Sequence, residues 1–369
     1  MPLPAHPSSE SGFPASTAIV PPVPTMRDVA AAAGVSASTV SRALRDDPRI
    51  TEATRLRVKD TARALGYRAN PYVTALTTQV RTRRASPLSP TVAVLETGPG
   101  PHSKAEWFRR YLAGIRTCAA EQGFSIDLLC IGSPGIPDSE AVGRVLRARG
   151  IWGLLVMPST GHASLEGIPF SSLACATIDP SLHEAPIHRA SPDYYQGMNL
   201  ALDSLQARGF RRIGFCTSRS ELSRIGGRWM GGYLAWQHER NAEGAAAPFL
   251  ALDFEPHPTA RGQAAEWRRN RRLFATWLER EQPDAVVSNL VFIAEWLHEL
   301  GCDGANGVRY ASLGLSAGDT WPGIDQRFEQ VGAAAFNLVS AQIYRNEVGL
   351  PAAPTTVLVP GVWCEGDLP

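Results

Sequence analysis

The stretch MRDVAAAAGVSASTVSRAL, residues 26–44, decides how the first part of this chain folds. Thr25 is a suitable N-cap in front of it, and Asp28, three residues later, completes a capping box. Gly34 then accepts a left-handed turn without steric cost. The sequence therefore predicts a short helix that ends at Gly34. Its apolar residues have the i, i+3, i+4, i+7 spacing of one helical face: Met26, Val29, Ala30 and Ala33.

A second helix is predicted directly after this turn, with Ser36 as its N-cap. Val40, Ala43 and Leu44 form its expected inner face, and a helix this short must dock on neighbours to be stable. A helix, a tight turn and a polar-faced helix are typical of a helix-turn-helix unit that places its second helix in the DNA major groove. A plain helical hairpin is the alternative at this point. The expected outer face carries Ala37, Ser38, Ser41 and Arg42.

A third helix is predicted from its N-cap Thr51 to Leu65, with Gly66 as its stop. Residues 25–84 contain twelve Lys or Arg and five Asp or Glu, whereas residues 85–369 contain 24 and 29. Positive charge is thus concentrated in the first part of the chain, as binding of a phosphate backbone requires. The third helix is expected to close a three-helix core through Ala53, Leu56, Ala64 and Leu65.

The pattern of residues 66–84, GYRANPYVTALTTQVRTRR, predicts another short helix. Asn70 and Pro71 are a suitable cap and first-turn pair, and Val73 and Leu76 would lie on one side of the helix. The helix is too short to be stable alone, so it should form only against a partner. An ordinary linker is the alternative.

Residues 25 to about 78 resemble the DNA-binding head of the lactose and galactose repressor family, the LacI/GalR family. The resemblance implies an all-α helix-turn-helix head over residues 25–69 and a hinge helix with a linker over residues 70–88. It is carried by DVA at residues 28–30, AGVS at 33–36, TVSRAL at 39–44, the spacing to Thr51, Thr54 and Arg55, the pair Gly66-Tyr67, and the hinge residues Asn70 and Leu76.

The resemblance also implies which residues contact DNA. Arg42 would face base edges, where an arginine can chelate a guanine. The hinge helices of two subunits would pair in the minor groove with Leu76 as an apolar wedge, and Val73 stands where the family usually has alanine. Ala37 and Ser38 would also face base edges, and Ser36 and Thr39 would hold phosphates. The full set of implied DNA contacts is Ser36, Ala37, Ser38, Thr39, Arg42, Thr51, Asn70, Val73 and Leu76.

From residue 89 onward, short apolar runs alternate with amphipathic stretches. Strands that alternate with helices predict parallel sheets covered on both faces, and the length favours two lobes. Strands are expected at residues 91–95, 125–130, 151–157, 174–178, 213–216, 285–288 and 308–313, and helices at about 105–122, 139–149, 194–208, 265–280 and 292–300.

This second part resembles the type I periplasmic-binding-protein fold, which the same family uses as an α/β effector-sensing core. RGFRRIGF at residues 208–215 and GIDQRFEQVGAAA at 323–335 carry the resemblance. A ligand is implied in the cleft between two lobes, at the strand ends. The implied lobes are residues about 91–186 plus 326–353, and 190–320 plus 358–369, with passages near 187–191, 320–326 and 353–358.

The implied effector contacts are incomplete for a typical sugar site. Arg228 stands where family members place a ligand-binding arginine, and Asn289 matches a cleft asparagine. Two expected aspartates are absent, because Leu290 follows Asn289 and Gly314-Leu315-Ser316 follows the late strand. We expect an unidentified small-molecule effector, a sugar or a related metabolite. The residues implied to contact it are Arg228, Asn289, Asp179, Asp193, Trp107 and Ser316.

A serine hydrolase is one alternative function. Residues 314–318 fit the G-x-S-x-G nucleophile elbow around Ser316. However, DTWPG at residues 319–323 breaks the helix that an elbow needs, and the last histidine, His298, precedes the serine. The cysteines and histidines also lack zinc-ligand spacing. We therefore expect no catalytic site, no metal and no cofactor.

A secreted solute-binding protein of the periplasmic type is the other alternative. Residues 1–24 contain seven prolines and lack the basic start of an export signal, so we expect a disordered tail. No apolar run is long enough to span a membrane. The expected protein is a cytoplasmic, nucleoid-associated homodimer that represses transcription from a pseudo-palindromic operator under control of an effector.

Overall fold

The computed structural model describes residues 24–44, 47, 49–65, 67, 90–97, 105–158, 165–182, 185–240, 248–254, 260–303 and 307–366. The chain forms two compact units, residues 1–69 and 70–369. The predicted tail up to residue 23 and the predicted hinge lie outside the described residues, as do its residues Asn70, Val73 and Leu76 and the helix stop Gly66.

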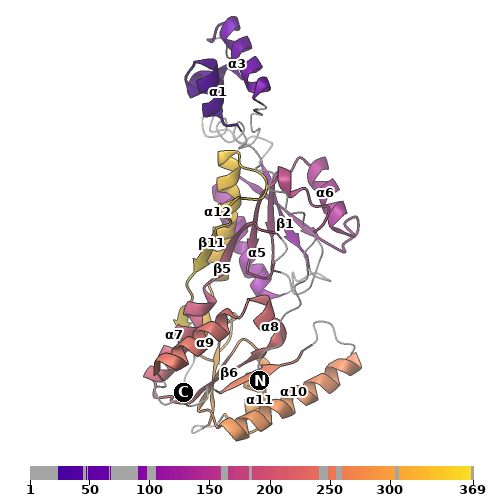
Figure 1. Ribbon diagram of the computed structural model, residues 1–369. Coiled ribbons are helices and arrows are strands. Elements are labelled where there is room, and N and C mark those ends of the chain that lie inside the picture. The colour runs from indigo at the N-terminus through magenta and orange to yellow at the C-terminus, as the bar shows by residue number, and fades with distance from the viewer. Residues whose placement is uncertain are drawn as a thin grey trace. The chain divides into compact units, whose positions relative to one another are not determined.

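The described part of the first unit contains α1 (Met26–Ala33), α2 (Ala37–Ala43) and α3 (Glu52–Ala64) (Figure 1). The capping box is confirmed, because Thr25 Oγ1 accepts from the backbone of Asp28 while the Asp28 carboxylate accepts from Thr25 N at 2.7 Å. Gly34 ends α1 in the left-handed region at a φ of 64°. Ser36 caps α2 by accepting from the backbone of Thr39 at 3.2 Å. The two short helices therefore begin and end where the sequence predicts.

The predicted inner face of α3 is wrong. Val58 and Ala62 are buried against α1 and α2, whereas Leu56 is 55% exposed. Leu56 precedes Val58 by two residues, which is about 200° around a helix, so the two side chains point in nearly opposite directions. The residues that were expected to close the core and instead lie exposed are Ala53, Leu56, Ala64 and Leu65.

In the second unit, the first sheet is parallel throughout and has the strand order β11-β5-β4-β3-β1-β2. α5 and α12 cover one face, and α6 covers the other (Figure 1). We call this sheet with its helices the first lobe. Its elements are β1 (Thr91–Glu96), α5 (Glu106–Glu121), β2 (Ser125–Cys130), α6 (Ser139–Ala148), β3 (Gly153–Val156), β4 (Ala174–Ile178), β5 (His188–Pro192), α12 (Phe328–Arg345) and β11 (Thr356–Val359), with a 3-10 turn at Phe170–Ser172.

The second sheet has the order β12-β10-β9-β8-β6-β7, and β12 is antiparallel to its neighbour β10. α7 and α9 pack on one face, and α10 and α11 pack on the other. We call this the second lobe. Its elements are α7 (Tyr194–Ala207), β6 (Ile213–Ser218), α8 (Arg219–Arg224), α9 (Arg228–Arg240), β7 (Phe249–Leu252), α10 (Ala260–Glu281), β8 (Ala285–Ser288), α11 (Phe292–Glu299), β9 (Arg309–Ser312), β10 (Gly323–Asp325) and β12 (Val362–Cys364).

Central strands of both sheets, such as β3, β4, β6 and β8, are buried along their whole length. Parallel strands covered on both faces read as continuous apolar runs, which is why the sequence predicts them well. The predicted α/β core of two lobes with parallel sheets is confirmed. None of the helices in the described parts of the chain is long and apolar enough to cross a membrane.

The chain passes between the two sheets after β5, after β10 and after β11. The passage after Asp325 falls within the expected range 320–326, whereas the passages after Pro192 and Val359 lie slightly later than expected. The reason is that β5 and β11 pair with each other as far as Pro192 and Val359. Residues 190–192 and 358–359, which the sequence assigned to the second lobe, thus lie in the first sheet.

Candidate functional site

The outer surface of α2 carries exposed polar side chains on a firmly anchored helix. Val40 and Ala43 are completely buried on its inner side. Arg42 is exposed and forms no ion pair with a residue in the described part of this unit. The nearby Asp47 carboxylate is held by Arg49 at 2.7 Å, and this hydrogen-bonded contact keeps the pKa of Asp47 well below its usual range. The Arg42 charge is therefore available to an external anion.

The hydroxyls at the start of α2 form a small network. Ser36 Oγ lies 2.8 Å from Ser38 Oγ and 2.9 Å from Thr39 Oγ1. Ala37 and Ser38 are exposed, as the sequence predicts for residues that face a groove. Thr51 is exposed at the N-cap position of α3, but its hydroxyl donates to Thr54 Oγ1 at 2.9 Å instead of capping the helix. These hydroxyls and the α2 N-terminus can donate to phosphate oxygens.

The second unit contains a cavity of about 300 Å³ between its two lobes. Asp179 follows β4, Asn289 follows β8 and Gly314 follows β9, so the cavity lies at the carboxyl ends of the parallel strands. Ligands of open α/β sheets bind at this edge. We call this cavity the cleft. It is lined by Trp107, Tyr111, Pro158, Asp179, Tyr194, Glu221, Arg224, Trp229, Asn289, Val291, Gly314, Ser316, Gln326 and Phe328.

A buried ion pair joins the two lobes inside the cleft. Asp179 of the first lobe is 1% exposed, and its Oδ1 lies 2.7 Å from Arg224 Nη1 of α8. Its other oxygen accepts from the Tyr194 hydroxyl, and Oδ1 also accepts from Ser181 N at 3.0 Å. Burial opposes the charge on Arg224, but Asp179 and Glu221 outweigh it, so the pKa of Arg224 is raised. The Arg224 guanidinium therefore stays charged although it is buried.

The remaining cleft residues provide one amide and an aromatic wall. Asn289 Oδ1 accepts from Thr217 Oγ1 at 2.6 Å, so its amide nitrogen is the group left for a ligand. Tyr194 and Trp229 pack edge to face with ring centroids 5.0 Å apart, and Tyr111 and Phe328 do so at 4.8 Å. Aromatic faces beside hydrogen-bonding groups suit a small ligand that is polar at its edges and apolar on its faces.

A second cross-link between the lobes lies beside the cleft. Arg110 of α5 donates to both carboxylate oxygens of Glu329, at 2.7 and 2.9 Å, and to Asp325 Oδ1 of β10 at 2.9 Å. It also donates to the Leu315 carbonyl at 3.3 Å, and Glu106 accepts from Ala317 N at 2.5 Å. The hydrogen bond from Arg110 lowers the pKa of Glu329.

The Arg110–Glu329 pair, which lies within the first lobe and holds the guanidinium that also contacts Asp325, should weaken in acid. The pKa of Glu329 is lower in the folded than in the unfolded chain, so its stabilisation is present above the ordinary carboxyl pKa and is lost as the pH falls through the folded value. Because Arg110 and Glu329 are 20% and 40% exposed, we expect Arg110→Gln to cost about 1 kcal/mol near neutral pH. Urea unfolding should show this cost shrinking between about pH 5 and pH 3. A cost that stays constant over this range would contradict the assignment.

The cleft includes four of the six effector contacts expected from the sequence: Trp107, Asp179, Asn289 and Ser316. It does not include Arg228 or Asp193. Arg228 Nη1 donates to the Ile225 carbonyl at 2.6 Å, and the Asp193 carboxylate caps α7 by accepting from Gln196 N at 3.0 Å. These two side chains therefore stabilise local backbone.

Sequence reasoning missed Arg224 and Glu221, which are ion-paired at 2.7 Å within α8. Their position in the sequence could have indicated them, because both residues lie shortly after the buried strand β6, at the strand end where a cleft is expected.

The structure does not provide the nucleophile elbow of the hydrolase alternative. Residues 314–322 contain turns and no helix, and Ser316 N donates to Asp319 Oδ2 at 2.8 Å. His298 lies on α11, where its Nδ1 is 2.9 Å from Asp303. Within the described ranges, no group of three or more His, Cys, Asp or Glu side chains could hold a metal ion.

Residues 25–70 match the family of bacterial regulatory proteins named lacI. The matched range covers the complete helix-turn-helix arrangement of the first unit. Over this range the chain is similar to the lacI family. The match confirms the resemblance of the head on which the sequence analysis relied, and Arg42 and the hydroxyl network of α2 lie within the matched range.

Transcriptional regulators resemble longer ranges of the chain, and a solved structure has a similar fold. The chain is 29% identical over 190 residues to the HTH-type transcriptional regulator PtxS of Pseudomonas plecoglossicida, a match that covers 51% of this chain and about half (52%) of that relative. It is 23% identical to the HTH-type transcriptional repressor PurR of Pectobacterium atrosepticum, with 86% of this chain and 90% of PurR covered. Its fold matches the lac repressor dimer bound to operator and the anti-inducer ONPF at a TM-score of 0.54 and 18% identity, covering 93% and 98% of the chains.

Proposed function

We propose that this protein is a transcriptional repressor that binds a pseudo-palindromic DNA operator as a homodimer and responds to a small molecule. The observation that carries the proposal is the α2 surface, where an exposed arginine without an ion-pair partner among the described residues follows a row of hydroxyls at a helix start. It lies in a head of the lacI family. A lac repressor structure of the same fold is a dimer on its operator.

The α2 side chains divide into two roles. Arg42 would read a guanine in the major groove, because a guanidinium can donate two hydrogen bonds to one guanine edge. Ser36 and Thr39 would fix the helix on phosphates, together with the exposed Thr51. Ala37 and Ser38 allow the helix to approach the bases closely. The hinge residues would add a minor-groove contact when two subunits pair.

Arg42→Ala should weaken specific operator binding by roughly 1–3 kcal/mol and leave binding to random duplex nearly unchanged. The operator would first be selected from a random duplex library with the wild-type protein. Fluorescence anisotropy on operator and random duplex then measures both affinities at one salt concentration.

Arg63→Ala is the matched control, because it removes one exposed cation from α3 of the same unit. It should reduce both affinities slightly and equally. If Arg42→Ala also reduced both affinities equally, Arg42 would only neutralise phosphate, and its role in reading bases would be rejected.

The cleft is the proposed effector site. Its lining provides the Asp179 carboxylate, the Asn289 amide and the Ser316 hydroxyl beside aromatic rings, a combination that suits a hydroxyl-rich metabolite such as a sugar or a sugar derivative. Residues of both lobes contribute, so a ligand that prefers one spacing of the lobes shifts the population toward it. We propose that this shift changes how the two hinge helices pair, and so changes operator affinity.

A further inference from the structure

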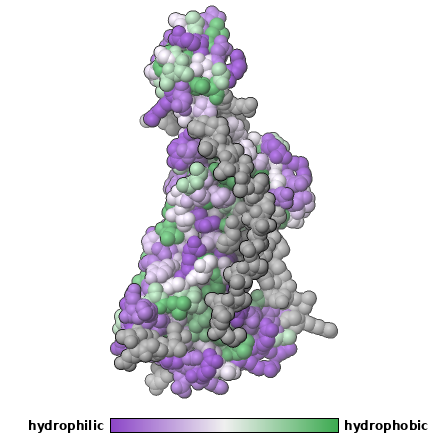
Figure 2. All heavy atoms as spheres, viewed as in Figure 1, coloured by the Kyte–Doolittle hydropathy of each residue, from purple (hydrophilic) through white to green (hydrophobic). Residues whose placement is uncertain are grey.

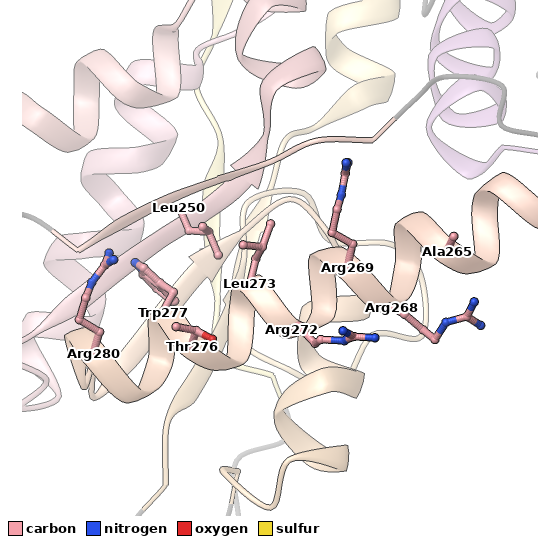
Figure 3. Close-up of a pocket in the computed structure, with 9 residues that line it drawn as sticks. All are labelled: Leu250, Ala265, Arg268, Arg269, Arg272, Leu273, Thr276, Trp277 and Arg280. Carbon is pink, nitrogen blue, oxygen red and sulfur yellow. The ribbon is translucent and has the colours of Figure 1, made fainter. Parts of the chain in front are cut away.

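A second cavity, of about 500 Å³, lies beside α10 on the outer side of the second lobe. α10 and the edge strand β7 form its walls, and it shares no lining residue with the cleft. Figure 2 shows hydrophilic residues over the lower edge of the core, where Figure 1 draws α10. The cavity is lined by Leu250, Ala265, Arg268, Arg269, Arg272, Leu273, Thr276, Trp277 and Arg280 (Figure 3).

This cavity is strongly cationic. Four arginines line it, and none of its described lining residues is a carboxylate. Arg268, Arg269 and Arg272 form no ion pair with any described residue, whereas Arg271 on the same helix pairs with Glu299 at 2.8 Å. Arg280 lies 2.9 Å from Glu281. Residues 85–369 contain more acids than bases, so overall composition does not explain this row of arginines.

In the absence of a ligand, repulsion between these arginines destabilises α10. Arg268 and Arg272 are four residues apart, and Arg269 and Arg272 are three apart, so their side chains lie next to each other on the helix. Like charges at these spacings destabilise a helix by a few tenths of a kcal/mol per pair. An anion between the guanidinium groups would convert this repulsion into attraction.

The middle of the cavity is apolar. Figure 3 shows Leu250, Leu273 and Trp277 between Arg280 at one end and Arg269 at the other. Leu273 is 46% exposed, so its side chain is accessible to a ligand in the cavity. Arg269 and Arg280 are eleven residues apart, which corresponds to about 16 Å along a helix. The site thus has an anion-binding end of three arginines, an apolar centre and one further arginine.

We propose that this cavity binds a small metabolite that carries two or more phosphate groups on an organic body, the chemistry of a nucleoside polyphosphate. Guanidinium groups bind phosphate oxygens through paired hydrogen bonds, and three arginines that have no ion-pair partner among the described residues match a ligand with several phosphate oxygens. Leu250 and Leu273 would contact the organic body. The volume lies within the range of small-molecule sites. This proposal is independent of operator binding and of the cleft ligand.

Isothermal titration of the full-length protein with ATP tests the proposal. We expect saturable binding of one ATP per chain, weaker binding of tripolyphosphate and no measurable binding of adenosine. Arg269→Gln and Arg272→Gln should each weaken ATP binding by about tenfold, because each removes one charged hydrogen-bonding partner from the phosphates. Leu273→Ser should weaken ATP binding but leave tripolyphosphate binding unchanged.

Two control variants make the assignment specific. Arg271→Gln removes an arginine of the same helix that is held by Glu299 outside the cavity, and Arg42→Ala removes a cation from the DNA-binding head. Both should bind ATP like the wild type. The proposal would be overturned by an equal loss in either control, by ATP binding that does not saturate, or by a synthetic acidic peptide that binds more tightly than ATP.

Discussion

Replacing Asp179 by asparagine should lower the free energy of unfolding by about 3 kcal/mol and remove the response to cleft ligands. The 1% exposed carboxylate holds Arg224 across the two lobes and also accepts from Tyr194 and Ser181. Breaking a buried ion pair leaves a charge without a partner. We place the cost at the lower end of the usual range because Glu221 still holds Arg224 at 2.7 Å.

The substitution is a clean test because the backbone at this position tolerates it. Asp179 has a φ of 70°, in the left-handed region that asparagine adopts almost as readily as aspartate. Urea unfolding measures the stability. Thermal shift against a panel of monosaccharides and sugar acids measures the ligand response, and a sugar that stabilises the wild type should leave Asp179→Asn unchanged.

Asp193→Asn is the matched control. Asp193 was also expected to contact the effector, but its side chain caps α7, and asparagine caps a helix as well as aspartate does. We expect nearly unchanged stability and a normal ligand response. Equal losses in the two variants would refute the special role of Asp179. The double variant with Arg224→Gln should be less destabilised than the sum of the single variants, because both remove the same ion pair.

The sequence analysis predicted many of the elements whose signal is local, although it missed the apolar runs of β7 (FLAL) and β11 (TVLV). β1, β2, β4 and β8 are short apolar runs, and α1 and α2 carry their own caps. β5, with the sequence HRASP, and β10, with GID, lack an apolar run, and they are strands because neighbouring strands pair with them. Pairing with distant residues cannot be read from a short window, so these strands were missed.

The cleft residues also divide into those that the sequence can predict and those that it cannot. Asp179, Asn289 and Ser316 follow strands that the sequence identifies, so they could be expected at one edge of the sheets. The position of a residue after a strand does not show which of Arg224 and Arg228 lines the cleft. Gly226 and Gly227, with φ of 62° and 68°, interrupt the helix between the two arginines and send them in different directions. That break is set by backbone conformation, which the spacing of the arginines does not reveal.

The other large effect is expected at Gly114, where the backbones of α5 and α12 are in close contact. Gly114→Ala should lower the free energy of unfolding by about 3 kcal/mol, the upper end of the usual cost of overpacking. A Cβ at Gly114 would lie 1.9 Å from the carbonyl oxygen of Glu329, and one at Gly332 would lie 2.3 Å from the carbonyl oxygen of Tyr111. Both obstacles are backbone atoms of helices, which cannot rotate away as a side chain can.

The same clash should reach the Arg110–Glu329 pair, which holds within the first lobe the arginine that links it to the second. Arg110 lies one turn before Gly114 on α5, and its guanidinium holds the Glu329 side chain, so moving α12 away would stretch this contact as well. Adding Arg110→Gln to Gly114→Ala should therefore cost less than the two separate changes together, a difference that urea unfolding of the three variants measures.

Gly231→Ala provides the opposite expectation for the same chemical change. Gly231 is exposed on α9, has no left-handed φ, and has no atom within 4 Å of an added Cβ. Alanine there should stabilise the protein by about 0.5–1 kcal/mol, since it removes backbone freedom from the unfolded chain. If Gly114→Ala were also stabilising, α5 and α12 would not be in backbone contact, and the anchoring of α12 beside the cleft would have to come from its side chains alone.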